Sequence, residues 1–286
     1  MHRGQRVNRN SSIELKTLSD DQLTLTGDQL KCVLINARSL NNKLPDLYQL
    51  LYSCDVDCVF VTETWLNNDI TDGLLDPDSK YEVMRNDRLQ MSGGGVCAVV
   101  KKGLHTRQIG IKNRHESVEL LCCDIFGAST VCRFFVVYRP PDSSHVYNNI
   151  SCYDYISNVV DCIERHSNPK GPTMVVGDFN CPDIVWGGCS VPCNRTSFQL
   201  YDFAVTNGFV QVVGESTRGN SLVDLVMTNQ PFRVLTANVE QPFGSSDHNS
   251  ISFSVAFERM VLLVLMVQVW YYRRCSTSLS VEEGQL

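Results

Sequence analysis

Two short segments of this chain place a carboxylate beside an amide or an imidazole. GDFN carries Asp178 and Asn180 two positions apart, and SDH carries Asp247 directly before His248. A carboxylate at such a turn can take a proton from a water molecule that the neighbouring amide orients. An imidazole can donate a hydrogen bond to a phosphoryl oxygen and so stabilise developing charge. Either segment alone is also typical of an ordinary turn, because Asp and Asn favour turns.

Polar side chains stand at or near the ends of other apolar runs as well. They are Asn36 after LKCVLI, Glu63 after CVFVT, Tyr138 after RFFVV and Asp224 inside SLVDLVMTN. Loops at strand ends carry many of the catalytic groups in layered α/β folds. Six apolar runs with an acid, amide, phenol or imidazole at one end predict a single site that collects side chains from many strands.

The side-chain types in this set match metal-assisted attack on a phosphate ester. Mg²⁺ prefers hard oxygen ligands, usually one or two carboxylates with water and substrate phosphate, and Glu63 supplies one such carboxylate. One nitrogen of His248 needs a carboxylate to fix its tautomer, and Asp224 is the candidate. A carboxylate inside a buried strand needs such a partner, since unpaired burial is costly. We therefore predict a Mg²⁺ site, with Mn²⁺ as a substitute ion.

The elements that must hold these residues are short apolar strands and a few helices. Strands are predicted at 30–35, 58–61, 96–100, 117–125, 131–138, 172–176, 222–227 and 250–257. Helices are predicted at 44–51, at 147–165 and from a Thr196 cap to 207. Strands outnumber helices, and the helices fall between groups of strands, which indicates an α/β architecture with central sheets and outer helices. Neighbouring strands that resemble hairpins argue against a parallel doubly wound sheet.

The composition is that of an ordinary globular protein, with 43% hydrophobic and 20% charged residues. A net charge of −6 argues mildly against a non-specific nucleic-acid binder, which is usually basic, but suits a carboxylate-rich metal site. The 13 cysteines are odd in number, and many lie in apolar runs, which indicates buried thiols in a reducing compartment. The N-terminal MHRGQRVNRNSS lacks the apolar stretch of a signal peptide. We expect an intracellular protein, cytoplasmic or nuclear, that is not secreted.

Three parts of the chain differ in character. Residues 1–28 are polar, and we expect a flexible segment; residues 29–258 carry the strands and helices of one domain; residues 259–286 form an apolar, then polar, tail. The apolar stretch 260–272 is shorter than the roughly 20 residues that a membrane span needs, so we expect no stable membrane association. It is either a last packed element or a segment outside the domain. The second interpretation is favoured, because the strand at 250–257 already completes the pattern.

Several segments resemble, in order, the endonuclease domain of non-LTR (LINE-type) retrotransposons. They are INARSL, VTETWL, YRPP, VVGDFN, SLVDLVMTN and SSDHNSI. That domain belongs to the endonuclease/exonuclease/phosphatase superfamily, with exonuclease III, DNase I and the apurinic endonucleases. The resemblance spans residues 30–257. It implies a four-layered α/β sandwich, with two mixed β-sheets packed face to face and helices outside, and a monomeric Mg²⁺-dependent endonuclease that nicks DNA.

The resemblance also implies roles for the catalytic residues. Asn36 would help to bind the scissile phosphate, and Glu63 would be the principal metal ligand. Tyr138 would contact the phosphate or the leaving group. Asp178 would activate water and also bind the metal, with Asn180 next to it.

The remaining roles concern the SDH segment and the rim of the site. Asp224 would pair with His248, which would contact a phosphate oxygen, and Asp247 would support the metal or the leaving-group side. Contacts to nucleic acid would come from Arg38, Arg139, Thr217, Arg218 and Ser246. Some superfamily members carry an acid at the position of Arg38, so metal binding depends more on Glu63 here.

Two alternative functions stay open. The chain could be a related phosphodiesterase or phosphatase that acts on another phosphoester, although the YRPP segment favours the nuclease. It could also be an inactive retrotransposon remnant, since in that family a reverse transcriptase follows the SDH strand, whereas this chain continues into the apolar tail.

Overall fold

The computed structural model describes residues 29–88, 92–112, 114–141, 150–188 and 190–257. The predicted N-terminal segment 1–28 and the tail 259–286 lie outside the described residues. Within the described part of the chain, no helix is long and apolar enough to cross a membrane.

Two six-stranded sheets form the centre of the molecule. The first sheet has the order β11 (Val234–Pro242), β12 (Asn249–Ala256), β1 (Gln29–Asn36), β2 (Cys58–Thr62), β4 (Val96–Lys101) and β3 (Tyr81–Asn86). The second has the order β5 (His105–Ile109), β6 (Glu119–Phe126), β7 (Val131–Tyr138), β8 (Thr173–Asp178), β10 (Asp224–Thr228) and β9 (Val210–Gln211). Both sheets are mixed, because β1 pairs with β2 in parallel and β7 with β8 in parallel, while the other pairs are antiparallel.

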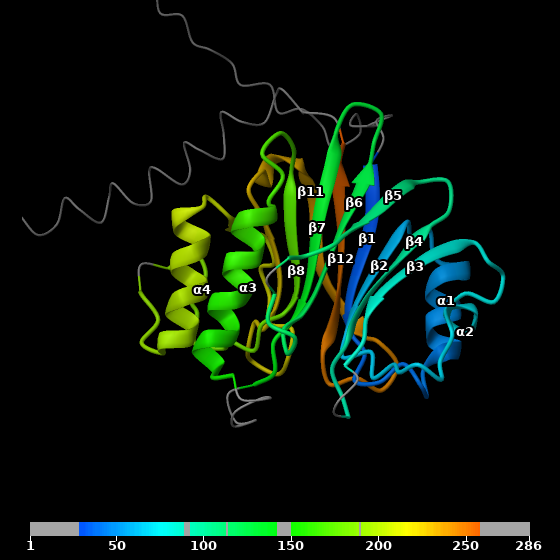
Figure 1. The fold of residues 1–286 in the computed structure, drawn as a ribbon, viewed down its shortest axis with the longest axis horizontal. Helices are drawn as coiled ribbons and strands as arrows, with labels where there is room; N and C mark the ends of the chain where they lie inside the picture. Colours follow the sequence, from blue (N-terminus) through cyan, green and yellow to red (C-terminus); the bar gives the residue numbers. More distant parts are fainter. Residues whose placement is uncertain (1–28, 89–91, 113, 142–149, 189, 258–286) are drawn as a thin grey trace, which may run out of the picture.

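Helices cover the outer face of each sheet (Figure 1). They are α1 (Leu44–Ser53) and α2 (Asp72–Leu75) on the first sheet, and α3 (Cys152–His166) and α4 (Arg195–Thr206) on the second. Three buried clusters separate the four layers, one between the sheets and one under each helical layer. Between the sheets, the stacked rings of Phe60 and Phe134 lie 4.7 Å apart. The predicted four-layered α/β sandwich is confirmed.

The eight predicted strands all form, and the structure adds β3, β5, β9 and β11. Two helix starts differ from the prediction. The third helix begins at Cys152, because the Ser151 side chain caps it by accepting from the Asp154 N–H. The fourth is capped by Asn194 rather than Thr196, since the Asn194 Oδ1 accepts from the Thr196 N–H at 2.8 Å.

The cysteines of the apolar runs are free thiols inside the sheets, as predicted from their neighbours. Buried thiols lie at Cys32, Cys58, Cys97, Cys122, Cys123 and Cys132. Burial raises the pKa of these thiols, to about 12 for Cys97. They therefore pack as small hydrophobic groups.

A buried acid joins three neighbouring strands of the second sheet. Asp124 on β6 is fully buried, and its cross-strand partners are Arg107 on β5 and Arg133 on β7. The Asp124 Oδ1 accepts from the Arg133 Nε at 2.7 Å, and its Oδ2 accepts from the Arg107 Nη2 at 2.8 Å. Asp124→Asn should lower the free energy of unfolding by about 3 kcal/mol at neutral pH, because it leaves Arg133 partly buried without its counter-charge.

The cost of this substitution should depend on pH. Burial raises the pKa of Asp124, but the hydrogen bonds and charges of Arg133 and Arg107 outweigh it, and the net pKa is lowered. The stabilisation is therefore present above the unfolded-state pKa of about 4 and is lost as the pH falls through the lower folded-state pKa. Urea unfolding at neutral and acidic pH measures this. Asp161→Asn, which breaks only the exposed pair with Arg165, should cost under about 0.5 kcal/mol. An equal cost of Asp124→Asn at every pH would contradict the linkage.

Candidate active site

Three polar residues lie side by side at one end of the second sheet. Tyr138 on β7 and Asp178 on β8 are register partners, and Asp178 is in turn the partner of Asp224 on β10. Side chains alternate between the two faces of a sheet along each strand. These three residues lie on the same face as Val136 and Val176, which belong to the core between the sheets. All three side chains therefore point towards the first sheet, and all three are buried.

The first sheet supplies the opposing groups. Asn36 ends β1, Glu63 follows β2, and His248 comes just before β12. The Asn36 Nδ2 donates to the Asp178 Oδ2 at 2.9 Å and to the Glu63 Oε1 at 3.1 Å. The His248 Nδ1 lies 2.8 Å from the Asp224 Oδ2. Two hydrogen bonds, Asn36–Asp178 and His248–Asp224, thus join the two sheets.

The pairing of Asp224 with His248 is present and buried, with both residues 1% exposed. Burial lowers the pKa of the imidazole, but the hydrogen bond and the charge of Asp224 outweigh it, so the His248 pKa is raised above its usual 6.5. The His248 Nε2 is buried and has no hydrogen-bond partner within the described residues. This nitrogen is therefore the one that can serve a ligand in the site.

Asp178 is fully buried and accepts three hydrogen bonds at the GDFN turn. Its Oδ1 accepts from the Asn180 N–H at 2.9 Å, and its Oδ2 accepts from the Asn36 amide and from the Asn180 Nδ2 at 3.0 Å. Burial and the charge of Asp224 raise the pKa of Asp178 well above its usual range, although His248 opposes this. Asn180 has φ +47°, a conformation that asparagine tolerates better than most residues.

The donors present fit a hard divalent cation. One ligand atom each of Glu63, Asp178 and His248 lies within 4.8 Å of the other two. Two carboxylates suit Mg²⁺ or Mn²⁺. Burial raises the pKa of Asp178, and a positive charge nearby would oppose this by favouring the ionised carboxylate. Glu63 and Asp178 are the residues that would hold the ion.

Asp247 was also expected as a metal ligand, and the structure does not place it with the others. Its Oδ1 accepts from the Arg38 Nη1 at 2.9 Å, and its Oδ2 pairs with the Arg218 Nη2 at 2.8 Å. Burial raises the pKa of Asp247, but the hydrogen bonds and charges of both guanidinium groups outweigh this and lower it. With both oxygens engaged, Asp247 holds two half-exposed arginines at the rim of the site.

Arg139 was expected to contact nucleic acid, but its guanidinium group faces backbone carbonyls of the GDFN turn. The residue is 1% exposed. Its Nη1 donates to the carbonyls of Phe179 and Asn180 at 3.0 and 2.9 Å. Arg139 therefore fixes the GDFN turn from behind. This burial could not be predicted from the residue type, because arginine is usually exposed.

The two hydroxyls expected near a phosphate also face the protein. The Ser246 Oγ donates to the Asn36 carbonyl at 2.7 Å and accepts from the His248 N–H at 3.2 Å. The Thr217 Oγ1 accepts from the backbone N–H groups of Val223 and Asp224 at 3.2 and 3.0 Å. Both residues are buried, and these hydrogen bonds position the neighbouring side chains of the site.

Thr217→Val tests this positioning role. Valine has the same shape but leaves the Val223 and Asp224 N–H groups without an acceptor, so unfolding should become easier by about 1–2 kcal/mol. We also expect a lower kcat with little change in KM. Thr228→Val is the matched control, because its buried hydroxyl accepts from the Gln230 N–H at the far end of β10. The control should lose similar stability and keep its activity; equal losses of activity would contradict the assignment.

Two residues of the site were not predicted in these roles. The Trp65 Nε1 donates to the Glu63 Oε2 at 3.2 Å, and its only signal in the sequence is its place two residues after Glu63 in VTETWL. Lys43 is buried, and its Nζ donates to the carbonyls of Ala37 and Arg38 at 2.5 and 3.2 Å. It supports the loop after β1, in which Arg38 and Ser39 have positive φ.

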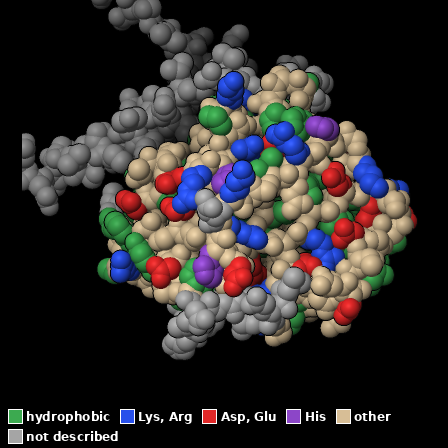
Figure 2. All heavy atoms as spheres, viewed as in Figure 1, with side chains coloured by type: hydrophobic (Ala, Val, Ile, Leu, Met, Phe, Trp, Pro, Cys, Tyr) green, Lys and Arg blue, Asp and Glu red, His purple; other side chains and the backbone are tan. Residues whose placement is uncertain are grey.

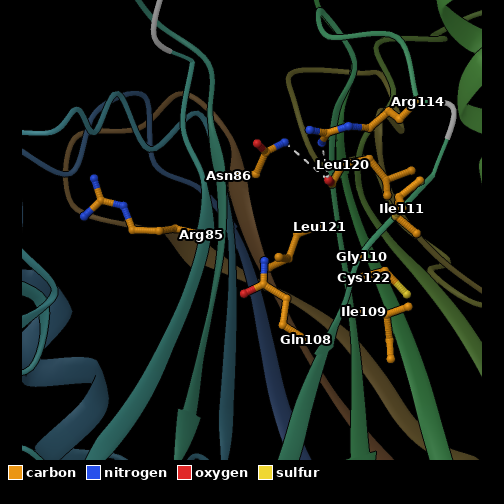
Figure 3. A pocket seen from close by; sticks show the side chains of 10 residues that line it. All are labelled: Arg85, Asn86, Gln108, Ile109, Gly110, Ile111, Arg114, Leu120, Leu121 and Cys122. Carbon is orange, nitrogen blue, oxygen red and sulfur yellow. Dashed lines mark hydrogen bonds between the residues drawn. The ribbon is translucent and has the colours of Figure 1, made fainter.

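A separate small cavity of about 170 Å³ lies between β3 and the β5–β6 hairpin (Figure 3). The side chains of Asn86 and Arg114 point towards each other across it, and both donate to the Leu120 carbonyl, while Arg85 points away. None of the predicted site residues is among those that line it. We assign it no part in the chemistry.

Comparisons with known proteins support the fold described above. A family model described as endonuclease-reverse transcriptase matches residues 132–252. None of the curated proteins matches the chain in sequence. Among solved structures, the endonuclease domain of TRAS1, a telomere-specific non-LTR retrotransposon, has a TM-score of 0.63 at 14% identity and covers 81% of this chain and 100% of its own.

Two apurinic (AP) endonucleases are similar to the same extent. The enzyme LMAP from Leishmania major has a TM-score of 0.61 at 14% identity, covering 80% of this chain and 88% of its own. An AP endonuclease from Archaeoglobus fulgidus has a TM-score of 0.60 at 14% identity, covering 80% and 100%. At such identities the structures show the shared fold. Together with the family model, they confirm the resemblance to the endonuclease/exonuclease/phosphatase superfamily.

Proposed function

We infer that this chain, a hydrolase of the endonuclease/exonuclease/phosphatase type by motif and fold, nicks DNA in a Mg²⁺-dependent reaction. One observation carries the inference. The ligand atoms of Glu63, Asp178 and His248 come from both sheets and lie within 4.8 Å of one another. A phosphoryl group bound at one of them is within reach of all three, so attack, charge stabilisation and proton transfer can occur at one point.

The residues divide the chemistry between them. Asp178 accepts the proton of the attacking water, while the amides of Asn36 and Asn180, both bonded to its Oδ2, fix its orientation. His248 donates from Nε2 to a non-bridging phosphate oxygen, and Asp224 favours the protonated form of the ring. A divalent cation held by Glu63 and Asp178 would supply positive charge that favours the ionised form of Asp178 and offsets the charge of the phosphate.

Tyr138 acts as a neutral donor in this scheme. Burial, together with the charges of Glu63 and Asp178, raises the pKa of its hydroxyl far above the ordinary value. The phenol therefore stays protonated at physiological pH. It can donate a hydrogen bond to the phosphate or to the departing oxygen, but it is a poor base.

DNA is the proposed substrate because two arginines stand at the rim of this site. The side chains of Arg38 and Arg218 are 47% and 42% exposed, and Asp247 holds both. Guanidinium groups bind phosphates well. On the face drawn in Figure 2, basic and acidic side chains are interspersed. Together with the net charge of −6, this favours a local grip on the phosphates flanking the cut over a broad basic surface.

Nicking of supercoiled plasmid by the full chain tests the proposal. We expect nicked circles with Mg²⁺ or Mn²⁺ and none when the ions are chelated. Release of phosphate from soluble phosphoesters is measured in parallel. Intact plasmid with turnover of a soluble phosphoester would support the related phosphatase instead. A well-folded protein that does neither would support the inactive remnant.

A further inference from the structure

The loop after β2 presents a large aromatic ring beside the metal ligand Glu63. Trp65 is 39% exposed, whereas its neighbours Thr64 and Leu66 are buried. The side chains to which the chemistry is assigned are acids, amides, an imidazole and a phenol, which suit phosphate and water. The exposed indole face is suited to a different part of a substrate.

One side-chain hydrogen bond, one backbone hydrogen bond and a nearby backbone segment position Trp65. Its Nε1 donates to the Glu63 Oε2 at 3.2 Å, and its backbone N–H donates to the Gly94 carbonyl at 2.8 Å. The chain at Gly93 passes close to the ring, since a Cβ there would lie 3.6 Å from the indole Nε1. The indole is therefore an oriented surface next to the carboxylate, and its rotation is restricted before any ligand arrives.

The backbone at this point is unfavourable for the residues that occupy it. Glu63 has φ +50° and Trp65 has φ +54°, and bulky side chains rarely adopt such values. Strained backbone of this kind is found mostly at functional sites, where surrounding contacts maintain it. Because the indole is exposed, its burial contributes little stability to offset the cost of this backbone conformation. The fold thus holds an aromatic side chain in a costly conformation at the edge of the site.

We propose that Trp65 is a nucleobase-binding platform, on whose exposed face a base next to the scissile phosphate stacks. This inference rests on the proposed nuclease function. Aromatic side chains bind the π-face of any base without reading its sequence. The hydrogen bond to Glu63 links the position of that base to the metal ligand. A base must leave the helical stack to reach the ring, so the platform favours DNA that is distorted or locally unpaired at the cut.

Binding to two matched DNA probes tests the platform. One probe is a labelled duplex with a short unpaired bubble, and the other is the same duplex with an abasic bubble. Both are bound by the full chain carrying Asp178→Ala, which prevents cleavage. Adding Trp65→Ala should raise the Kd for the base-bearing bubble about 10-fold and leave the Kd for the abasic bubble within about 2-fold. Trp65→Phe keeps an aromatic face and should stay within about 2-fold on both.

Salt dependence provides a second readout. Stacking releases no counterions, so Trp65→Ala should keep the slope of log Kd against log salt, whereas Arg218→Ala should reduce it by about one. Val205→Ala removes an exposed apolar side chain of α4 and should bind both probes like its parent. Melting temperatures confirm that each variant is folded.

The proposal is overturned if Trp65→Ala binds the base-bearing bubble normally, or loses affinity equally for the abasic one. It is also overturned if Trp65→Phe is as weak as Trp65→Ala, because the indole N–H alone would then matter. If the wild type nicks plasmid in any of these cases, the platform fails and the nuclease function stands. If the wild type neither nicks nor binds DNA, both fail.

Discussion

Asp178→Ala should slow plasmid nicking at least about 10³-fold and leave the melting temperature within a few degrees of the wild type. The loss of activity follows from the place of this carboxylate, which receives the Asn36 and Asn180 amides and lies within 4.8 Å of the Glu63 and His248 ligand atoms. Its removal deletes the proposed base and one ligand of the cation together.

Two opposing effects explain why stability should hardly change. The substitution loses the three hydrogen bonds that Asp178 accepts. It also removes a fully buried carboxyl group whose pKa is raised by burial and by Asp224, and that raised pKa shows that the fold disfavours its charge.

Gel assays of nicking and calorimetry measure the two results. Asp202→Ala, which removes an exposed acid on α4, is the matched control and should match the wild type in both. An Asp178→Ala protein that keeps a tenth of the wild-type rate would rule out the proposed base.

Asp224→Asn should lower kcat/KM about 10²–10³-fold near neutral pH and move the alkaline limb of the pH profile to lower pH. The charge and hydrogen bond of Asp224 are what raise the pKa of His248 against burial. With asparagine at position 224, burial becomes the larger influence on the His248 pKa and lowers it. The ring therefore loses its proton at a lower pH. A neutral imidazole carries a single N–H. It therefore cannot donate a hydrogen bond from Nδ1 to residue 224 and another from Nε2 at the same time.

A double-mutant cycle separates this effect from general damage. If Asp224 acts through the imidazole, then Asp224→Asn should have little further effect in a His248→Ala background. The wild-type profile should fall as the pH rises through the raised His248 pKa. Equal effects of Asp224→Asn with and without the imidazole, or an unchanged alkaline limb, would remove His248 from the proposed role.

The strands that the sequence predicted and those that it missed differ in one physical respect. All eight predicted strands are interior, and β3, β5, β9 and β11 are the four edges of the two sheets. Interior strands are covered on both faces, so they appear as continuous apolar runs. An edge strand such as β5, HTRQI, is largely exposed and lacks that signal. Its pairing depends on a neighbour that local sequence does not reveal.

The residues that belong to the candidate site were easier to predict than the directions of their side chains. The motifs indicated that Asn36, Glu63, Asp178 and His248 stand at strand ends, and the structure brings them together. They did not indicate the direction of each side chain. Arg139 turns inward to backbone carbonyls, and Asp247 turns outward to two guanidinium groups. Those directions depend on partners distant in sequence.

The position of β12 in the first sheet affects when the site can form. This strand is the last in the described part of the chain, yet it lies between β11 and β1, and His248 immediately precedes it. During synthesis, β1 emerges long before its β12 neighbour, and pairing between such distant segments forms late. A chain still being translated therefore carries Asn36 and Glu63 without the imidazole that faces them. The proposed active site is therefore incomplete until β12 has left the ribosome and inserted.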